Sequence, residues 1–253
     1  MVLKRLFARK ENPAPKPASI PAGKRVYAIG DIHGRADLLD QLLIKILADD
    51  AARGNADAQI IFLGDLADRG PGSRQVIEHA MALAQSRPDT VFIMGNHEEL
   101  LLRVWDGDRP TASIFHRGGG RETLMSYGIA AEDYDSWDLG DVVDAAMRVV
   151  PKAHIDFLRC FRPAYRLGDY FFTHAGVRPG IALDDQDEKD LRWIRADFID
   201  STADFGAVVV HGHTIRDEVE ERPNRIGIDT GAYASGRLTA IGLEGTDRWY
   251  LST

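Results

Sequence analysis

Five short stretches of the chain place Asp, Asn or His at or just after the end of a run of apolar residues. The side chains placed in this way are Asp31, His33, Asp65, Asn96, His174 and His213. Carboxylates, imidazoles and an amide oxygen suit divalent ions of the manganese, iron or zinc type, whereas a structural zinc site would be rich in cysteine. A carboxylate such as Asp65 can bridge two ions, which then polarise a phosphoryl group and lower the pKa of a bound water. The pattern therefore predicts a two-metal hydrolytic site in which water is the nucleophile and no Ser or Cys nucleophile is required.

The apolar runs are the elements that must position these side chains. They are short and unbroken by polar residues, which is typical of strands buried on both faces of a sheet. Helical spacing of apolar residues follows the first run over residues 37–52 and the second over residues 76–83. This order of strands and helices implies right-handed parallel crossovers and a layered α/β fold. If the five strands are neighbours in one sheet, their carboxyl ends bring the six side chains to one edge, where ligands bind in open α/β sheets.

The strand pattern is interrupted between about residues 106 and 162, where helical spacing takes over. We expect a mainly helical insertion there, placed as a cap beside the metal edge, with Gly118-Gly119-Gly120 helping to shape the pocket. The β pattern returns at residue 164 with a hairpin signal around Gly168-Asp169. Residues 191–199 are expected to be helical. Further strands are predicted at residues 207–210, 225–228, 238–243 and 248–251.

The chain is expected to form a single domain over residues 25–253. Its 253 residues, of which 44% are hydrophobic, suffice for a full core. Residues 1–24 are basic and rich in proline, and we expect a flexible leader there. The alternative is a basic arm that touches an acidic partner or an anionic membrane surface.

Charge and cysteine content exclude several functions. The net charge of -8 argues against specific or general nucleic-acid binding. Cys160 is the single cysteine, so no internal disulfide can form. The chain shows neither a signal-peptide pattern nor an apolar run long enough to span a bilayer. We predict a cytoplasmic protein without stable membrane insertion, and the oligomeric state is left open.

Five motifs in this order resemble the signature of the calcineurin-like metallophosphoesterases. They are Gly30-Asp31-Ile32-His33-Gly34, Gly64-Asp65-Leu66-Ala67-Asp68-Arg69-Gly70, Gly95-Asn96-His97-Glu98, His174-Ala175-Gly176 and Gly212-His213-Thr214. More narrowly, they resemble the bacterial phosphoprotein phosphatase branch, which comprises serine/threonine protein phosphatases, and Ile228-Asp229-Thr230-Gly231-Ala232 resembles a late segment of its members. The resemblance implies a layered metallophosphoesterase-type β-sandwich flanked by helices, with two bound divalent ions. Mn²⁺ is expected first, with Fe or Zn as alternatives.

The resemblance also implies which side chains hold the two ions. The ligands would be Asp31 and His33 for the first ion, Asp65 as the bridge, and Asn96, His174 and His213 for the second ion. His211, which precedes the last motif, is expected to support the site or the core without binding an ion.

Four further residues would act on the substrate if the resemblance holds. His97 would be the general acid that protonates the leaving oxygen, and Asp68 would orient it through a hydrogen bond. Arg69 would clamp phosphate oxygens, which a guanidinium fork suits. Arg195 resembles the family's second phosphate arginine, and a surface ion pair on a helix is its alternative.

Three functions remain open. The first is a protein serine/threonine phosphatase acting on phosphorylated proteins, with broader activity on small phosphoesters as an option. Its rival is a symmetrical dinucleoside tetraphosphate hydrolase, from a related family whose second motif usually has a non-acidic residue before the Arg-Gly pair. Asp68 occupies that position here and the last motif ends in Thr214, so the phosphatase is ranked first. The third is a non-catalytic metal-bound binding protein, which would be expected to lack a ligand or His97.

Overall fold

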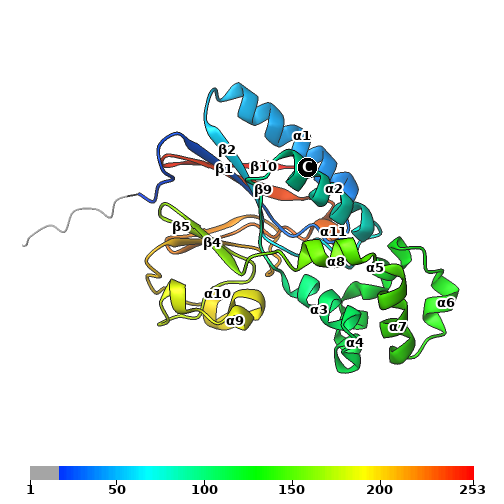
Figure 1. The fold of residues 1–253 in the computed structure, drawn as a ribbon. Coiled ribbons are helices and arrows are strands. Elements are labelled where there is room, and N and C mark those ends of the chain that lie inside the picture. The colour runs from blue at the N-terminus through cyan, green and yellow to red at the C-terminus, as the bar shows by residue number, and fades with distance from the viewer. Residues whose placement is uncertain (1–16) are drawn as a thin grey trace, which may run out of the picture.

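The computed structural model describes residues 17–253, which form two five-stranded sheets packed face to face with helices on their outer sides (Figure 1). The first sheet has the order β10-β9-β1-β2-β3 and the second has the order β4-β5-β6-β8-β7. The strands of the first sheet are β1 (Lys24–Ile29), β2 (Asp57–Phe62), β3 (Val91–Phe92), β9 (Thr239–Glu244) and β10 (Asp247–Ser252). Those of the second are β4 (Ala164–Leu167), β5 (Tyr170–Thr173), β6 (Val208–His211), β7 (Glu220–Arg222) and β8 (Arg225–Gly227). The expected layered α/β sandwich is therefore confirmed.

The expectation that the five predicted strands share one sheet is wrong. β1, β2 and β3 pair in parallel in the first sheet, whereas β5 and β6 pair in parallel in the second. β3 has only two residues and forms one edge of the first sheet. Ile93, which follows it, makes an isolated parallel bridge to Arg162. After the helical insertion, the chain therefore starts a second sheet instead of extending the first.

Alternating side chains explain why the strands are buried on both faces. In β1, Val26 and Ala28 belong to the apolar layer between the two sheets, whereas Tyr27 and Ile29 belong to the core under the outer helices. In β5, Phe171 points away from the layer between the sheets and packs with residues of the helices on the far side. The molecule thus has four layers, in the order helices, sheet, sheet, helices.

Helices cover the first sheet and fill the expected insertion (Figure 1). Those that follow the first two strands are α1 (Ala36–Ala52) and α2 (Ser73–Ser86). The third strand leads into α3 (Asn96–Trp105), α4 (Arg109–Phe115), the π-helical turn η1 (His116–Gly120), α5 (Arg121–Ser126), α6 (Ala131–Asp135), α7 (Leu139–Val149) and α8 (Lys152–Leu158). The remaining helical elements are the 3₁₀ turn η2 (Leu183–Asp185), α9 (Glu188–Trp193), α10 (Ala196–Ile199) and α11 (Ala232–Ser235). The insertion consists of helices joined by short turns, and these helices gather at one end of the molecule.

Two local expectations differ from the structure. The helix predicted over residues 191–199 is broken between α9 and α10, because Ile194 and Arg195 leave the helical conformation. Of the expected leader, residues 1–16 lie outside the described part of the chain. The residues that follow pack onto the domain: Ile20 is buried and its N–H donates to the Gly245 carbonyl at 2.8 Å.

Among residues 17–253, no helix is both long and apolar enough to cross a membrane.

Candidate metal centre

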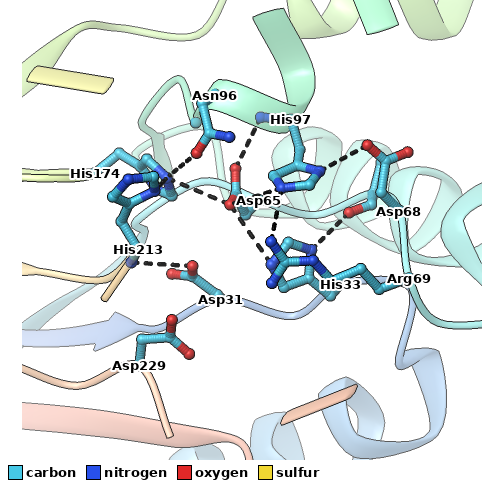
Figure 2. Close-up of polar contacts among 12 residues, drawn as sticks. Asp31, His33, Asp65, Asp68, Arg69, Asn96, His97, His174, His213 and Asp229 are labelled. Carbon is cyan, nitrogen blue, oxygen red and sulfur yellow. Dashed lines mark hydrogen bonds and ion pairs between the residues drawn. The ribbon is translucent and has the colours of Figure 1, made fainter. Parts of the chain in front are cut away.

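The side chains that follow the carboxyl ends of parallel strands in both sheets converge on one place (Figure 2). A hydrogen bond from the His213 backbone N–H to Asp31 Oδ2, 3.0 Å long, joins the loop after β6 to the loop after β1. His174 Nδ1 lies 2.9 Å from the Leu63 carbonyl and so joins the end of β5 to the end of β2. Although the motifs are divided between two sheets, the six predicted ligands therefore lie together.

Asp65 stands at the middle of this cluster. Its Oδ2 lies 3.3 Å from His174 Nε2, 3.5 Å from His33 Nε2 and 3.9 Å from His97 Nε2. Asp65 belongs to two groups of donor atoms. One group also contains His33 and His97, and the other contains His174 and His213. Within each group the donor atoms lie within 4.8 Å of one another. A carboxylate shared by two donor sets is the arrangement that a bridge between two cations requires.

The hydrogen bonding of the cluster is incomplete in a way that fits bound cations. Asp31 Oδ1 and His213 Nε2 are buried and have no hydrogen-bond partner. His174 Nε2 lies 2.9 Å from Asn96 Oδ1 and 3.2 Å from His213 Nδ1, in addition to its contact with Asp65. One imidazole nitrogen carries at most one proton and cannot satisfy all three. Divalent cations would satisfy these converging lone pairs, so the residues present fit a metal pair.

The backbone is strained at the same place. Among residues 17–253, positive φ outside glycine occurs at His33, Asp65, Asp68, Arg69 and His213. Their φ angles lie between 47° and 70°, a region that costs non-glycine residues of order 1–3 kcal/mol each. All five are residues that sequence reasoning assigned to the site. Strain concentrated in this way marks a functional site independently of any resemblance.

Two motif glycines make room for the carboxylates. A Cβ atom at Gly95 would lie 2.2 Å from Asp65 Oδ1, and one at Gly212 would lie 2.0 Å from Asp31 Oδ1. Any larger residue would therefore displace the carboxylate from its place in the cluster.

His97 is held by a buried network that reaches into the helical insertion. Its Nδ1 lies 2.7 Å from Asp68 Oδ2, and the other oxygen of Asp68 accepts a 2.6 Å hydrogen bond from Thr123 Oγ1 of α5. Burial alone would lower the pKa of His97, but the charge of Asp65 and the hydrogen bond to Asp68 outweigh it, and the pKa is raised. The pair therefore favours a protonated imidazole, as a general acid requires.

His97 Nε2 is also placed where it could bind a cation. It lies 3.1 Å from Arg69 Nη2, and it belongs to the donor group around His33 and Asp65. Because the guanidinium can only donate, this contact uses a neutral imidazole whose proton sits on Nδ1 toward Asp68. The geometry thus admits His97 either as a general acid or as a metal ligand.

The two arginines differ in how firmly they are placed. The Arg69 backbone N–H donates to the Gly119 carbonyl at 3.1 Å, which anchors Arg69 to the Gly118-Gly119-Gly120 loop. Arg195 is exposed, and its Nη1 donates to the His213 carbonyl at 3.4 Å. This hydrogen bond points toward the site, whereas the alternative of a helix ion pair would require an acidic partner. The break between α9 and α10 puts Arg195 in this position.

Three other residues contact the cluster and were not assigned to it from sequence. They are Glu98, Asp229 and Tyr233. Asp229 follows β8 and repeats the pattern of an apolar run followed by a carboxylate, so a signal for it was present. Its Oδ2 is buried without a partner, and burial raises its pKa. Burial together with the charges of Asp229 and Asp65 also raises the pKa of Asp31, an electrostatic repulsion that a cation would relieve.

Glu98 organises the loop after β2. Its carboxylate accepts backbone N–H groups from Asp65 at 2.7 Å, Leu66 at 2.8 Å and Gly95 at 3.1 Å, and it is fully buried. Burial and the charge of Asp65 raise its pKa to about 7, although the N–H groups act in the opposite direction. Glu98 therefore fixes the backbone around Asp65 and does not contribute a metal ligand.

Glu98→Gln is expected to destabilise the fold. Each carboxylate oxygen of Glu98 accepts two backbone N–H groups, and the amide keeps only one of these oxygens. Two buried N–H groups therefore lose their acceptor, at a cost of about 1–3 kcal/mol each. At this chain length each unpaired group corresponds to a drop in Tm of roughly 2–12 °C. Thermal unfolding of the metal-free chain at pH 5 measures it without interference from metal binding. At higher pH the raised pKa of about 7 means that the charge of Glu98 itself costs folding free energy, which the neutral amide would not incur. The control is Glu78→Gln, at a surface pair with Arg74, and an equal Tm for both variants would contradict this role.

The fold and the cluster together define a class of protein. A two-sheet α/β sandwich whose strand ends gather Asp, Asn and His side chains around one shared carboxylate is built as a metal-dependent hydrolase. The family described as calcineurin-like phosphoesterase matches residues 24–227, and the chain belongs to that family. It is therefore a metallophosphoesterase, whose family uses a binuclear metal centre.

Individual proteins similar to this chain include dinucleoside tetraphosphatases. Bis(5'-nucleosyl)-tetraphosphatase PrpE (asymmetrical) of Anoxybacillus flavithermus is 28% identical over 84% of the chain and 88% of its own length. A symmetrical bis(5'-nucleosyl)-tetraphosphatase of a Janthinobacterium species is 32% identical to this chain. The match covers 60% of this chain and 44% of the relative's length. A solved structure of a putative diadenosine tetraphosphatase aligns with a TM-score of 0.62 at 20% identity, covering 93% of this chain and 98% of that chain. At this identity the structural likeness shows the fold alone.

Proposed function

We propose that this protein hydrolyses dinucleoside tetraphosphates at a site that binds two divalent cations, with Mn²⁺ as the expected ions and Fe or Zn as alternatives. The supporting observation is the similarity to tetraphosphatases named as asymmetrical, which extends over 84–85% of the chain in three relatives. Symmetrical enzymes match over shorter parts. This similarity reverses the order in which the sequence motifs alone had ranked the protein phosphatase and the dinucleotide hydrolase.

In this proposal the residues of the cluster divide into holding and reacting groups. Asp31, His33, Asp65, Asn96, His174 and His213 hold the cations. When bound, the cations supply Lewis-acid stabilisation of the phosphoryl oxygens and make a water nucleophilic near neutral pH.

The reacting groups bind the phosphate and move a proton. The guanidinium of Arg69 binds phosphate oxygens, and Arg195, which donates to the His213 carbonyl, supplies a second positively charged side chain. His97 donates the proton of its Nε2 to the leaving oxygen, and Asp68 holds the imidazole in position through Nδ1. A departing nucleotide thus leaves protonated, which removes the need to expel a fully charged phosphate.

The second candidate function is the protein serine/threonine phosphatase. One observation favours it: Asp68 is acidic and pairs with His97 at 2.7 Å, at a motif position that is usually non-acidic in the related dinucleotide hydrolases. The two candidates use the same cluster and differ only in what the surrounding surface accepts.

Substrate competition separates the two candidates. The full chain loaded with Mn²⁺ is expected to show a kcat/KM for diadenosine tetraphosphate at least about 10-fold above that for a phosphoserine peptide, equivalent to about 1.4 kcal/mol in the transition state. Chromatography of the products is expected to show two unequal nucleotides. Turnover of p-nitrophenyl phosphate in the same preparation serves as the control for an active site. A preference for the peptide would overturn the proposal in favour of the phosphatase.

A further inference from the structure

A cavity of about 650 Å³ lies beside the metal centre, between the loop before α1, the start of α2 and the short helix α11. Residues that line it and bear on its chemistry are Arg35, Asp37, Arg69, Gln75 and Tyr233. Its volume is within the range of about 300–1,000 Å³ that is usual for pockets that bind small molecules. The cavity is thus large enough to hold a part of the substrate that extends beyond the reacting phosphate.

Two side chains belong both to this cavity and to the metal centre. Arg69 Nη2 lies 3.1 Å from His97 Nε2, and the guanidinium carbon of Arg69 lies 4.8 Å from the ring centroid of Tyr233. The Tyr233 ring in turn meets the His33 ring edge to face, with centroids 5.5 Å apart. A group in the cavity and a phosphate at the cluster would therefore contact the same two side chains.

The chemistry of the cavity suits a flat ring with polar edges. Tyr233 is 37% exposed and stands next to the flat guanidinium of Arg69, and both groups stack on aromatic bases. The charge of Arg35 is already paired with Asp37, through hydrogen bonds of 2.8 Å and 2.7 Å. Gln75 is exposed, with an amide that can donate and accept. Arg69 can therefore bind a phosphate, while the other side chains that line the cavity can contact an uncharged group.

We propose that this cavity binds the nucleoside attached to the reacting phosphate, with its base stacked against Tyr233. The proposal rests on the proposed function, because it assigns a place to one half of a dinucleoside substrate. It makes Tyr233 a residue that discriminates nucleotides from other phosphoesters. A phosphopeptide would offer no ring at this position unless an aromatic residue followed the phosphorylated one.

Binding of two matched ligands tests the assignment. AMP and ribose 5-phosphate share the sugar and the phosphate, and only AMP carries a base. Calorimetric titration of the Mn²⁺-loaded full chain is expected to show tighter binding of AMP. In Tyr233→Ala the ratio of the two affinities should fall by about 5-fold to 150-fold, the range for loss of one base stack. Tyr233→Phe keeps the ring and should keep the ratio.

The alternative role for Tyr233 is to position Arg69 without touching the base. In that case Tyr233→Ala would weaken AMP and ribose 5-phosphate by the same factor, which would overturn the proposal. Equal affinities of the unaltered chain for the two ligands would overturn it as well. Circular dichroism of both variants checks that the fold is retained.

Failure of this assignment and failure of the proposed function give different results. If diadenosine tetraphosphate is hydrolysed but the affinity ratio does not depend on Tyr233, the base lies elsewhere and only the pocket assignment is wrong. If the ratio depends on Tyr233 but the dinucleotide is not hydrolysed, the pocket assignment holds and the proposed function is wrong.

Discussion

Asp65→Asn is expected to lower kcat/KM by at least about 100-fold while the domain remains folded. Cations supply several kcal/mol of transition-state stabilisation, and each 1.4 kcal/mol corresponds to a factor of ten. Asp65 Oδ2 lies within 3.3–3.9 Å of three imidazole nitrogens and is common to both donor groups. An amide of the same shape keeps an oxygen at this place but carries no charge, so it cannot bridge two cations.

Metal content and activity together check this prediction. Mass spectrometry of the dialysed variant should find fewer bound ions per chain than in the unaltered protein. Turnover of p-nitrophenyl phosphate reports the activity, and thermal unfolding reports the fold. Asp184→Asn, which changes an exposed carboxylate in η2, is the matched control and should behave like the unaltered chain. Near-normal turnover in Asp65→Asn would refute a metal pair built around this carboxylate.

His97→Ala is expected to reduce kcat for the dinucleotide by about 100-fold to 10,000-fold, the usual contribution of a general acid. The loss should be smaller for p-nitrophenyl phosphate than for a phosphoserine peptide, because nitrophenolate leaves readily without a proton whereas an alkoxide does not. The variant should still bind its full complement of ions if His97 acts as the acid. Loss of one ion per chain would instead assign His97 to the donor group with His33 and Asp65.

The same residue sets an expected pH dependence. The pKa of His97 is raised, because the charge of Asp65 and the hydrogen bond to Asp68 outweigh burial. A general acid works only when protonated, so kcat should fall as pH rises through this pKa. Asp68→Asn removes a carboxylate that raises it, and the falling limb should move to lower pH. His79→Ala, at a half-exposed histidine on α2, is the control, and an unmoved limb in Asp68→Asn would contradict the pairing.

The two candidate functions differ in features that lie outside the motifs, which explains why the motifs alone separate them poorly. The motif residues build the cluster, and both candidate functions need the same cluster. Discrimination depends on what lines the space around it, such as the cavity beside Arg69 and Tyr233. Those walls come from the loop before α1, the start of α2 and α11, which are far apart in the sequence.

The sequence by itself determined the elements and the types of residue at their ends. Apolar runs without polar alternation predicted buried strands, and the amphipathic spacing of residues 37–52 predicted α1. These are local signals, because strand and helix periodicity are read over a few neighbouring residues. The same locality explains why the strand–carboxylate pattern pointed to Asp31 and Asp65 without any knowledge of their partners.

Only the tertiary structure decided how those ends meet. It placed β5 and β6 in a second sheet, broke the helix before Arg195 and brought Thr123 of the insertion against Asp68. It also turned Glu98 toward the backbone of Asp65 and set Tyr233 between His33 and Arg69. Each of these contacts joins residues remote in the chain, and their geometry follows from the packing of whole layers, which no local pattern encodes.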